Sequence, residues 1–254
     1  MNEFLLFTMY SPMSSWGEIA VGEIRSSKTH PGRSAVLGIV AAALGIRRTD
    51  SVKLNNLHKC FSLGVKVISS GSLINDFHTV QAARTQKSTP YRKRFDELNA
   101  GADMIGTIVS TREYRSDAMY IVALWKNTVT AEYTLHEIQD ALNEPVFTPY
   151  LGRKSCPPAC KFVPQVIAAE TLKEAFNQYG VKPLWFGNNN SNNDGKYERK
   201  VFETDAELYY CDECENSGFD RMLVTERYDK VLDATRRQFS SRQETMTLIR
   251  KGGV

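Results

Sequence analysis

Residues 31–46 read PGRSAVLGIVAAALGI, an apolar segment that predicts a helix with Ser34 as its N-cap and an end near Ile46. Several of its residues are small, which would let the helix lie close against a sheet: Ala35, Gly38, Ala41, Ala42 and Ala43. The apolar run 3–9 precedes this segment and predicts a buried first strand. We therefore expect the chain to begin with a strand followed by a helix.

Further strands and a second helix are predicted on the C-terminal side of this helix. The patterns favour strands at 61–68, 73–80, 104–110 and 118–125, and a helix at 130–142. This order predicts an α+β fold with a ferredoxin-like (RRM-like) βαββαβ body in residues 1–150. Residues 151–254 are expected to form a smaller β-rich C-terminal region, with an acidic insertion at about 187–226.

Positive and negative residues are unevenly distributed, although the net charge is only +3. The segment 81–94 contains no acidic residue and five cations, namely Arg84, Lys87, Arg92, Lys93 and Arg94. The segment 203–226, in contrast, is strongly acidic. Cations on a protruding segment favour a surface that follows a phosphate backbone, and two solvated loops are the alternative interpretation.

Residues 148–157 read TPYLGRKSCP and combine an aromatic ring, a glycine and two cations. Tyr150 offers a face on which a base can stack, and Arg153 and Lys154 can neutralise phosphate. Gly152 has no Cβ, so its backbone can approach a ligand closely. The segment predicts a contact with single-stranded nucleic acid, with an ordinary basic turn as the alternative.

The five cysteines are an odd number, which argues against a disulfide framework. Together with an N-terminus that does not resemble a signal peptide, this predicts a cytoplasmic protein. Cys156 with Cys160, and Cys211 with Cys214, are spaced so that four thiolates binding a structural zinc ion are an alternative to free thiols. We favour free thiols and expect no metal and no cofactor. No run of 18 apolar residues exists, so no membrane partner is expected either.

Motifs of several enzyme classes are missing from the sequence. It contains no GxxxxGKS/T, HExxH or GxSxG pattern, so NTP hydrolysis, zinc proteolysis and α/β-hydrolase chemistry have no support. RNA cleavage without a metal needs a general base, and His78, in a predicted strand before the basic segment, is the candidate. A structural or an RNA-contacting histidine is the alternative.

Six sequence blocks, spread along nearly the whole chain, are shared with a known protein family in the same order, and chance does not explain this agreement. They are SPMSSWG at 11–17, PGRSAVLG at 31–38, DFHTV at 76–80, REY at 112–114, FTPYLGRKSCP at 147–157 and RQFSSR at 237–242. Through these blocks the chain resembles the CasD family of the RAMP superfamily, subunits of type I-E CRISPR Cascade complexes. The resemblance implies a ferredoxin-like body with a basic β-hairpin thumb at about residues 80–112, and no catalytic site.

The resemblance also implies a function. The chain would bind and cap the 5′ handle of the crRNA in antiviral defence, and contact the Cascade backbone subunits and the large PAM-reading subunit, with only indirect contact to target DNA. Carried over by position, the RNA-facing candidates are Trp16, Arg33, His78, Arg112, Tyr150, Leu151, Gly152, Arg153, Lys154 and Ser155. The basic segment adds Arg84, Arg92, Lys93 and Arg94.

The chain departs from the family pattern in two places. Residues 183–226 are longer and more acidic than expected, and neither Cys160 nor the CxxC pair belongs to the family pattern. The related type I-C subunit cleaves guide precursors with grouped Tyr, Lys and His. Since His58-Lys59 and His78 are present here, a metal-independent endoribonuclease that processes CRISPR repeat RNA is the alternative function, and a protein–protein adaptor is a third.

Overall fold

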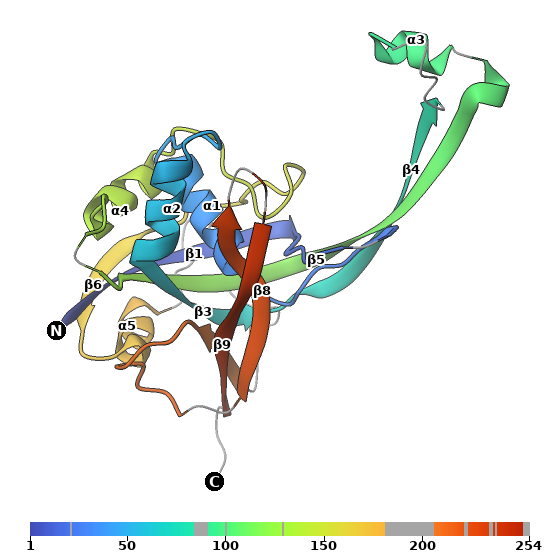
Figure 1. Ribbon diagram of the computed structural model, residues 1–254. Helices are drawn as coiled ribbons and strands as arrows, with labels where there is room; N and C mark the ends of the chain where they lie inside the picture. The colour runs from blue at the N-terminus through green and yellow to red at the C-terminus, as the bar shows by residue number, and fades with distance from the viewer. Residues whose placement is uncertain are drawn as a thin grey trace, which may run out of the picture.

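Strands β1 (Asn2–Ser14) and β5 (Ile105–Lys126) pair antiparallel within one large sheet, which positions all other elements (Figure 1). The computed structural model describes residues 1–20, 22–83, 91–99, 101–128, 130–180, 206–220, 223–233, 236 and 238–250. Its other elements, in chain order, are β2 (Ile24–Arg25), α1 (Arg33–Ala43), α2 (Ser51–Cys60), β3 (Phe61–Ser69), β4 (Ser72–Ala83), α3 (Arg94–Leu98), a 3₁₀ turn (Ala102–Met104), α4 (Leu135–Asn143), β6 (Gln165–Ala169), α5 (Leu172–Tyr179), β7 (Ala206–Cys211), β8 (Leu223–Asp233) and β9 (Gln238–Arg250).

The strand order is β6-β1-β5-β3-β7-β9-β8, and every neighbouring pair in it is antiparallel. Outside this path, β4 forms an antiparallel hairpin with β5, and the short β2 runs parallel to β5. The predicted combination of helices with a large antiparallel sheet is thus confirmed. Because β6 pairs with β1 and β7 pairs with β3, the boundary expected at residue 150 is not a break in the sheet.

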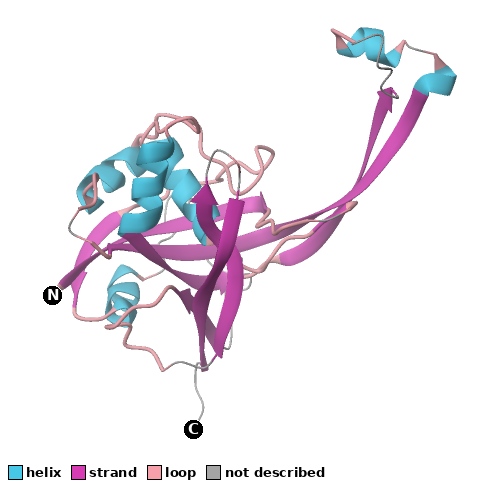
Figure 2. Cartoon of the chain, in the orientation of Figure 1, coloured by secondary structure: helices cyan, strands magenta, loops and turns pink. Residues whose placement is uncertain are grey.

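The sheet is covered on both faces, by α1, α2 and α4 on one side and by α5 on the other (Figure 2). Successive side chains of a strand point to opposite faces, so Leu5, Phe7 and Met9 enter one core while Phe4 and Leu6 enter the other. This double burial explains why the first strand is an uninterrupted apolar run. Within the described residues, no helix is long and apolar enough to cross a membrane.

Helix α1 begins two residues earlier than the sequence predicts, at Arg33 with Gly32 instead of Ser34 as its N-cap. Glycine is needed there because a Cβ at Gly32 would lie 2.6 Å from a carboxylate oxygen of Asp229 on β8. The small residues Ala41 and Ala43 are buried as expected, but Gly38 is exposed. One side of α1 therefore does not lie against the sheet.

Two further helices differ from expectation. Helix α4 begins at Leu135, because Thr134 and Glu137 form a capping box in which each side chain accepts a bond from the other's backbone N–H. Helix α2 was not predicted. Its polar sequence buries only Leu57 and Cys60, so it lacks the apolar periodicity by which an amphipathic helix is recognised.

Strand β5 is continuous where the sequence predicts two strands with a return at residues 111–115. Its residues 105–116 pair with β4, and its residues from Ala118 onward pair with β1 and β3. Asp117, between the two parts, has a positive φ of 53°. The β4–β5 hairpin consequently leaves the body as a long projection, with α3 at its end (Figure 1).

Candidate nucleic-acid interface

The segment 148–157 follows α4 and is docked against the end of β1. The backbone N–H of Leu151 donates to the Cys156 carbonyl at 2.7 Å, and the N–H of Ser15 donates to the Leu151 carbonyl at 3.1 Å. The N–H of Cys156 donates to the Arg153 carbonyl at 2.9 Å, so the segment closes on itself. Leu151 is completely buried, and its side chain anchors the turn instead of facing RNA as expected.

Gly152 is required by a contact within the protein. Its φ is +89°, and a Cβ at this position would lie 1.7 Å from the carbonyl oxygen of Ser15. The close approach predicted for its backbone therefore exists, but the neighbour is Ser15 of the same chain. Around it, Tyr150 is half-buried while Lys154 and Ser155 are exposed, so these three side chains reach the surface.

Arg153 connects this turn to the base of the β4–β5 hairpin. Its guanidinium donates to the carbonyl of Glu113 on β5 and to the carbonyl of Arg25 on β2, both at 3.3 Å. It also lies over the ring of Tyr114, 4.6 Å from the ring centre, which is the geometry of a cation–π contact. The turn and the hairpin base, far apart in sequence, thus form one continuous surface.

Four arginines lie on the elements around this place, and we call Arg25, Arg112, Arg115 and Arg153 the arginine junction, although Arg112 and Arg115 are three residues apart on β5 and their side chains leave opposite faces of that strand. β2 and β5 bring Arg25 next to Arg112 in register, and Arg115 donates to the carbonyl of Ser27 at 3.4 Å. Among the described residues, no carboxylate oxygen lies within 4 Å of a guanidinium nitrogen of the four, although Asp76 is the register partner of Arg112. The junction is therefore a concentration of positive charge that the body does not neutralise.

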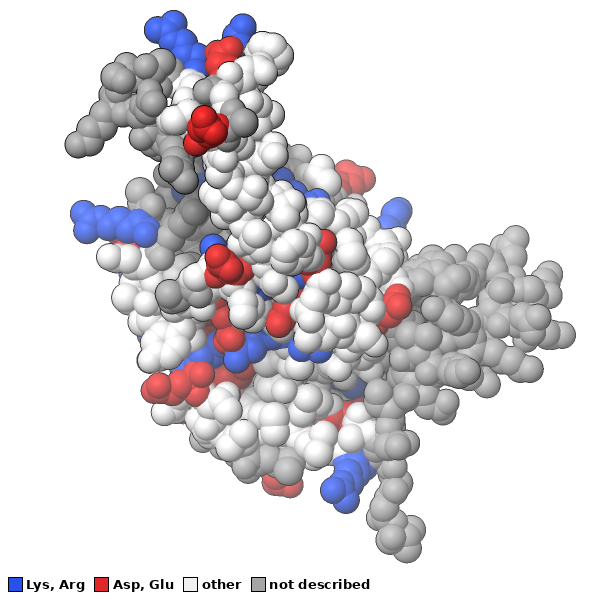
Figure 3. Space-filling view, turned by 90° about the vertical axis from the view of Figure 1, so that its right-hand side faces the viewer, with Lys and Arg blue, Asp and Glu red and all other residues white. Residues whose placement is uncertain are grey.

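The end of the hairpin carries a second group of cations (Figure 3). Arg92 and Lys93 are exposed. Arg94 is held within the hairpin end, because its guanidinium donates to the Glu97 carboxylate at 2.5 Å and to the carbonyl of Gln81. An exposed ion pair of this kind contributes little stability, so it leaves Arg94 able to exchange partners.

The two groups of cations lie well apart along the hairpin. The β4–β5 ladder runs from the pair Asp76–Arg112 to the pair Ala83–Ile105, which is seven steps along β4 (83 minus 76). At about 3.3 Å per residue this distance is roughly 23 Å. Arg84, predicted to belong to the same basic segment, lies outside the described residues.

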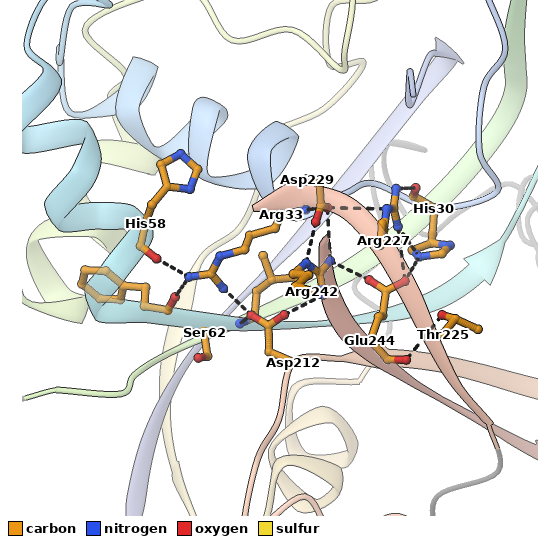
Figure 4. A network of polar contacts seen from close by, with 12 residues as sticks. His30, Arg33, His58, Ser62, Asp212, Thr225, Arg227, Asp229, Arg242 and Glu244 are labelled. Atoms are coloured by element: carbon orange, nitrogen blue, oxygen red, sulfur yellow. Dashed lines mark hydrogen bonds and ion pairs between the residues drawn. The ribbon is translucent and has the colours of Figure 1, made fainter. Parts of the chain in front are cut away.

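His78 lies on β4, with a side chain that is 40% exposed and an Nδ1 atom 3.9 Å from the Asp76 carboxylate. His58, the other histidine of the nuclease alternative, lies on α2 (Figure 4). Burial and the nearby charge of Arg33 lower the pKa of His58 to about 4. The Nδ1 atom of His58 is buried and has no hydrogen-bond partner among the described residues, so this nitrogen does not face an open surface.

Two further candidates have buried side chains, which corrects their expected role as RNA contacts. Trp16 is 1% exposed, and its indole N–H donates to the Tyr120 hydroxyl at 3.0 Å. Arg33 is buried as well, where it forms an ion pair with Asp212 and donates to the carbonyls of His58 and Phe61. Both side chains stabilise the body and do not reach a ligand on its surface.

Arg33 belongs to a buried network of charged side chains that the sequence alone did not reveal (Figure 4). The network joins the start of α1 to β7, β8 and β9, and its members are His30, Arg33, Asp212, Arg227, Asp229, Arg242 and Glu244. Arg242 is at its centre, 2.8 Å from Asp212 and 2.7 Å from Glu244. Three arginines face three carboxylates, so the network is balanced and offers no charge to RNA.

Glu244 shows how strongly these charges interact. Burial alone would raise its pKa, but the hydrogen bond with His30 and the positive charges of Arg227 and Arg242 lower the pKa to about 2. The sequence carried a signal for this arrangement. Arg227 and Asp229 on β8, and Arg242 and Glu244 on β9, are opposite charges two residues apart, which places each pair on one face of its strand.

The four cysteines considered for zinc do not converge. Cys156 lies in the core on the side of α1, whereas Cys211 lies in the core on the side of α5. Within the described residues, no three His, Cys, Asp or Glu side chains are grouped so that they can hold a metal ion. Burial raises the pKa of Cys160 to about 11, which disfavours the thiolate that zinc requires.

A groove of about 880 Å³ begins at the turn and was not expected from the sequence. Tyr150 and Gly152 of the turn line it, together with the exposed side of α1, including Gly38. Tyr228 of β8 and Phe239 of β9 line it as well. The groove therefore connects the turn to the C-terminal hairpin.

Known proteins resemble this chain over most of its length. The model of the CRISPR-associated protein (Cas_Cas5) family matches residues 4–242. The CRISPR system Cascade subunit CasD of Escherichia coli (strain K12) is 34% identical over 165 residues, which are 62% of this chain and 68% of that protein. A chain of a solved CRISPR RNA-guided surveillance complex matches with a TM-score of 0.63 and 25% identity, over 97% of this chain and 90% of that chain. A solved Cas protein shares the fold, with a TM-score of 0.55 at 19% identity over 98% of this chain and 95% of that chain. The resemblance predicted from the sequence is thus confirmed, and the chain belongs to the Cas5 family of CRISPR-associated proteins.

Proposed function

We propose that this chain is a non-catalytic subunit of a type I-E CRISPR surveillance complex that binds and caps the 5′ handle of the crRNA. The arginine junction is the observation that carries this proposal. Four arginines that form no ion pair with a described carboxylate, on elements joined to the turn that carries the half-buried Tyr150, could combine phosphate binding with a stacking face. The CasD relative is a Cascade subunit, and the structural neighbour is an RNA-guided complex, which agrees with an RNA ligand.

The body that presents the junction is, in this proposal, ferredoxin-like. Its four strands follow the order β6-β1-β5-β3, with α1 between β1 and β3 and α4 between β5 and β6. In chain order these strands are the fourth, first, third and second of a βαββαβ unit, all antiparallel. The β4–β5 hairpin is inserted between the second and third, where the proposed thumb belongs.

Exposed side chains of the hairpin support contacts with other subunits. Phe77 on β4, Ile108 on β5 and Phe95 on α3 are large apolar residues at the surface. We assign this projection to the nearest Cascade backbone subunit, and the region beside the handle to the large PAM-reading subunit. Contact with target DNA would then be indirect, and the complex would work in the cytoplasm without a membrane.

Binding of a handle oligonucleotide to the purified full chain tests the proposal. If each junction arginine contacts one phosphate, the logarithm of the binding constant should fall with the logarithm of salt concentration with a slope of about −3. Arg112→Ala should weaken binding and reduce this slope by roughly 0.7, whereas Lys173→Ala on α5 should change neither. Equal affinity for a scrambled oligonucleotide would contradict recognition of the handle.

The proposed absence of catalysis is tested with repeat RNA in the presence of EDTA. The exposed His78 has only Asp76 as a charged partner among the described residues, and His58, although Arg33 is near it, has its unpaired Nδ1 buried, so neither histidine presents an accessible base beside a cation for the leaving oxygen. We expect intact RNA after incubation with the wild-type chain. Specific cleavage that disappears in His78→Ala or His58→Ala would establish the endoribonuclease instead.

A further inference from the structure

The groove described above has a lining suited to flat rings. Its volume of about 880 Å³ lies within the range of small-ligand sites in proteins. Its polar lining includes Ser34 and Arg48, and its apolar lining includes Ile39 and Phe147. Because Tyr150 and Gly152 also line it, the groove opens directly onto the turn that forms part of the proposed RNA surface.

The floor of the groove is open because α1 presents small residues there. Ala35, Gly38 and Ala42 line it, and a Cβ at Gly38 would meet nothing within 4 Å. Gly38 lies in the middle of a helix, where glycine is less favourable than alanine. Packing therefore does not require this glycine, and a small residue at this position leaves the groove open, whereas a large side chain would extend into it.

The lining of the groove also includes the aromatic ring of Tyr228, which lies on a strand that is anchored to the body. Tyr228 is 59% exposed, while its neighbours Arg227 and Asp229 are buried in the charged network. Asp229 also accepts the backbone N–H of Arg33 at 2.6 Å, which ties β8 to the first turn of α1. The backbone that carries Tyr228 is consequently tied to the helix before any ligand arrives.

We infer that this groove receives one or two unpaired bases of the RNA strand whose phosphates cross the arginine junction, and that Tyr228 is their stacking face. The inference rests on the proposed function, since it extends the same RNA site. Bases fit better than phosphates, because the described residues that line the groove include aromatic rings and small apolar residues and, among them, Arg48 as the single cation. The two acidic residues among these lining residues are already paired, Glu18 with Lys28 and Asp229 with Arg242.

Two pairs of variants test the inference in the full chain with a handle oligonucleotide. Tyr228→Ala should weaken binding about 10-fold, and Tyr228→Phe should keep most of the affinity, because the stacking face remains. Gly38→Leu should block the groove and weaken binding without lowering the melting temperature, whereas Gly38→Ala should bind RNA like the wild type.

A fluorescent base identifies the nucleotide that enters the groove. In a set of handle oligonucleotides with 2-aminopurine at successive positions, one or two positions should be quenched on binding to the wild type and become brighter with Tyr228→Ala. Replacing those positions by abasic sites should remove the difference between wild type and Tyr228→Ala. A difference that persists with abasic sites would show that Tyr228 does not act through a base.

The outcomes separate this inference from the proposed function. If Arg112→Ala weakens binding while Tyr228→Ala and Gly38→Leu do not, the RNA site stands and the groove is not part of it. If those two variants bind RNA normally but no longer assemble with the other subunits, the groove is a protein-binding site and the inference is wrong. If the wild-type chain does not bind the handle at all, both proposals are overturned.

Discussion

Arg33 at the start of α1 and Asp212 at the end of β7 form an ion pair inside the protein, with only 8% and 10% of their side chains exposed. The two residues are far apart in sequence, and the sequence pointed elsewhere for both, since Arg33 was a candidate RNA contact and Asp212 lies in a CxxC segment for which zinc was the alternative to free thiols. The structure instead makes them the link between the first helix and the C-terminal strands. Their pairing determines what Arg33 variants should reveal.

Replacement of Arg33 should destabilise the fold. Arg33→Ala leaves Asp212 buried without one of its two arginine partners, and losing one member of a buried pair costs roughly 3–5 kcal/mol. Thermal unfolding of the purified chain measures this loss, with the exposed Arg236→Ala as a control that should unfold like the wild type. If the Arg33→Ala chain keeps its melting temperature but loses RNA binding, the structural role is wrong and Arg33 contacts RNA directly.

Substitution of Gly152 should primarily destabilise the turn itself, and only through the turn weaken RNA binding. Gly152→Val must adopt a positive φ, which alone costs about 1–3 kcal/mol, and its Cβ would collide with the Ser15 carbonyl. Denaturant unfolding should therefore show a marked loss of stability. Gly17→Ala, next to the same strand end but with open space around its Cβ, should be nearly neutral. Unchanged stability of Gly152→Val would contradict the contact with Ser15.

Reversing the charges at the hairpin end should prevent recovery of guide RNA with the complex. Arg92, Lys93 and Arg94 are changed together to Glu, and the chain should remain folded because these residues lie outside both cores. The matched control changes the charge by the same amount elsewhere, with Lys53, Lys59 and Lys173 replaced by Glu. Normal guide recovery with the hairpin variant, or equal loss with the control, would argue against a specific role for the hairpin end.

Stability should fall when the pH is lowered below about 6.5, and His58 should account for part of the loss. Its pKa is about 4 in the folded chain, against an ordinary value of 6.5, so protons bind more tightly to the unfolded chain. The stabilising effect of the neutral ring is complete above pH 6.5 and is lost as the pH falls toward 4, by up to roughly 3 kcal/mol. Urea unfolding of wild type and His58→Gln at pH 7, 5.5 and 4.5 measures this. Parallel pH profiles for the two chains would exclude His58 as the cause.

The first half of the fold could be read from the sequence because its strands and α1 are strongly apolar. The strand at 61–68 ends within one residue of β3, for example. Helix α2 was not predicted, because a helix that buries only Leu57 and Cys60 has no periodic apolar face. The second part of β5 was recognised, but not its continuity through Asp117, since a positive φ at a non-glycine residue leaves no trace in an apolar pattern.

The candidate site was only partly readable, because neighbouring residues in a motif can have opposite environments. Tyr150, Arg153 and Lys154 reach the surface as predicted for a ligand contact, although the contact itself is a proposal. Leu151, between them, is buried, and Gly152 serves a backbone contact. The groove wall at Tyr228 comes from a strand distant in sequence, so no local motif could indicate it.

The ladder between β4 and β5 is uninterrupted. The hairpin can therefore be shortened without turning its outer side chains to the other face only by removing an even number of residues from each strand. Deleting two facing residues from each strand would draw the outer end about 7 Å closer to the body and leave every side chain on its original face. Deleting one from each would exchange the two faces over the whole outer segment. If the hairpin contacts a neighbouring subunit as proposed, its reach toward that subunit should therefore be adjustable only in steps of two residues.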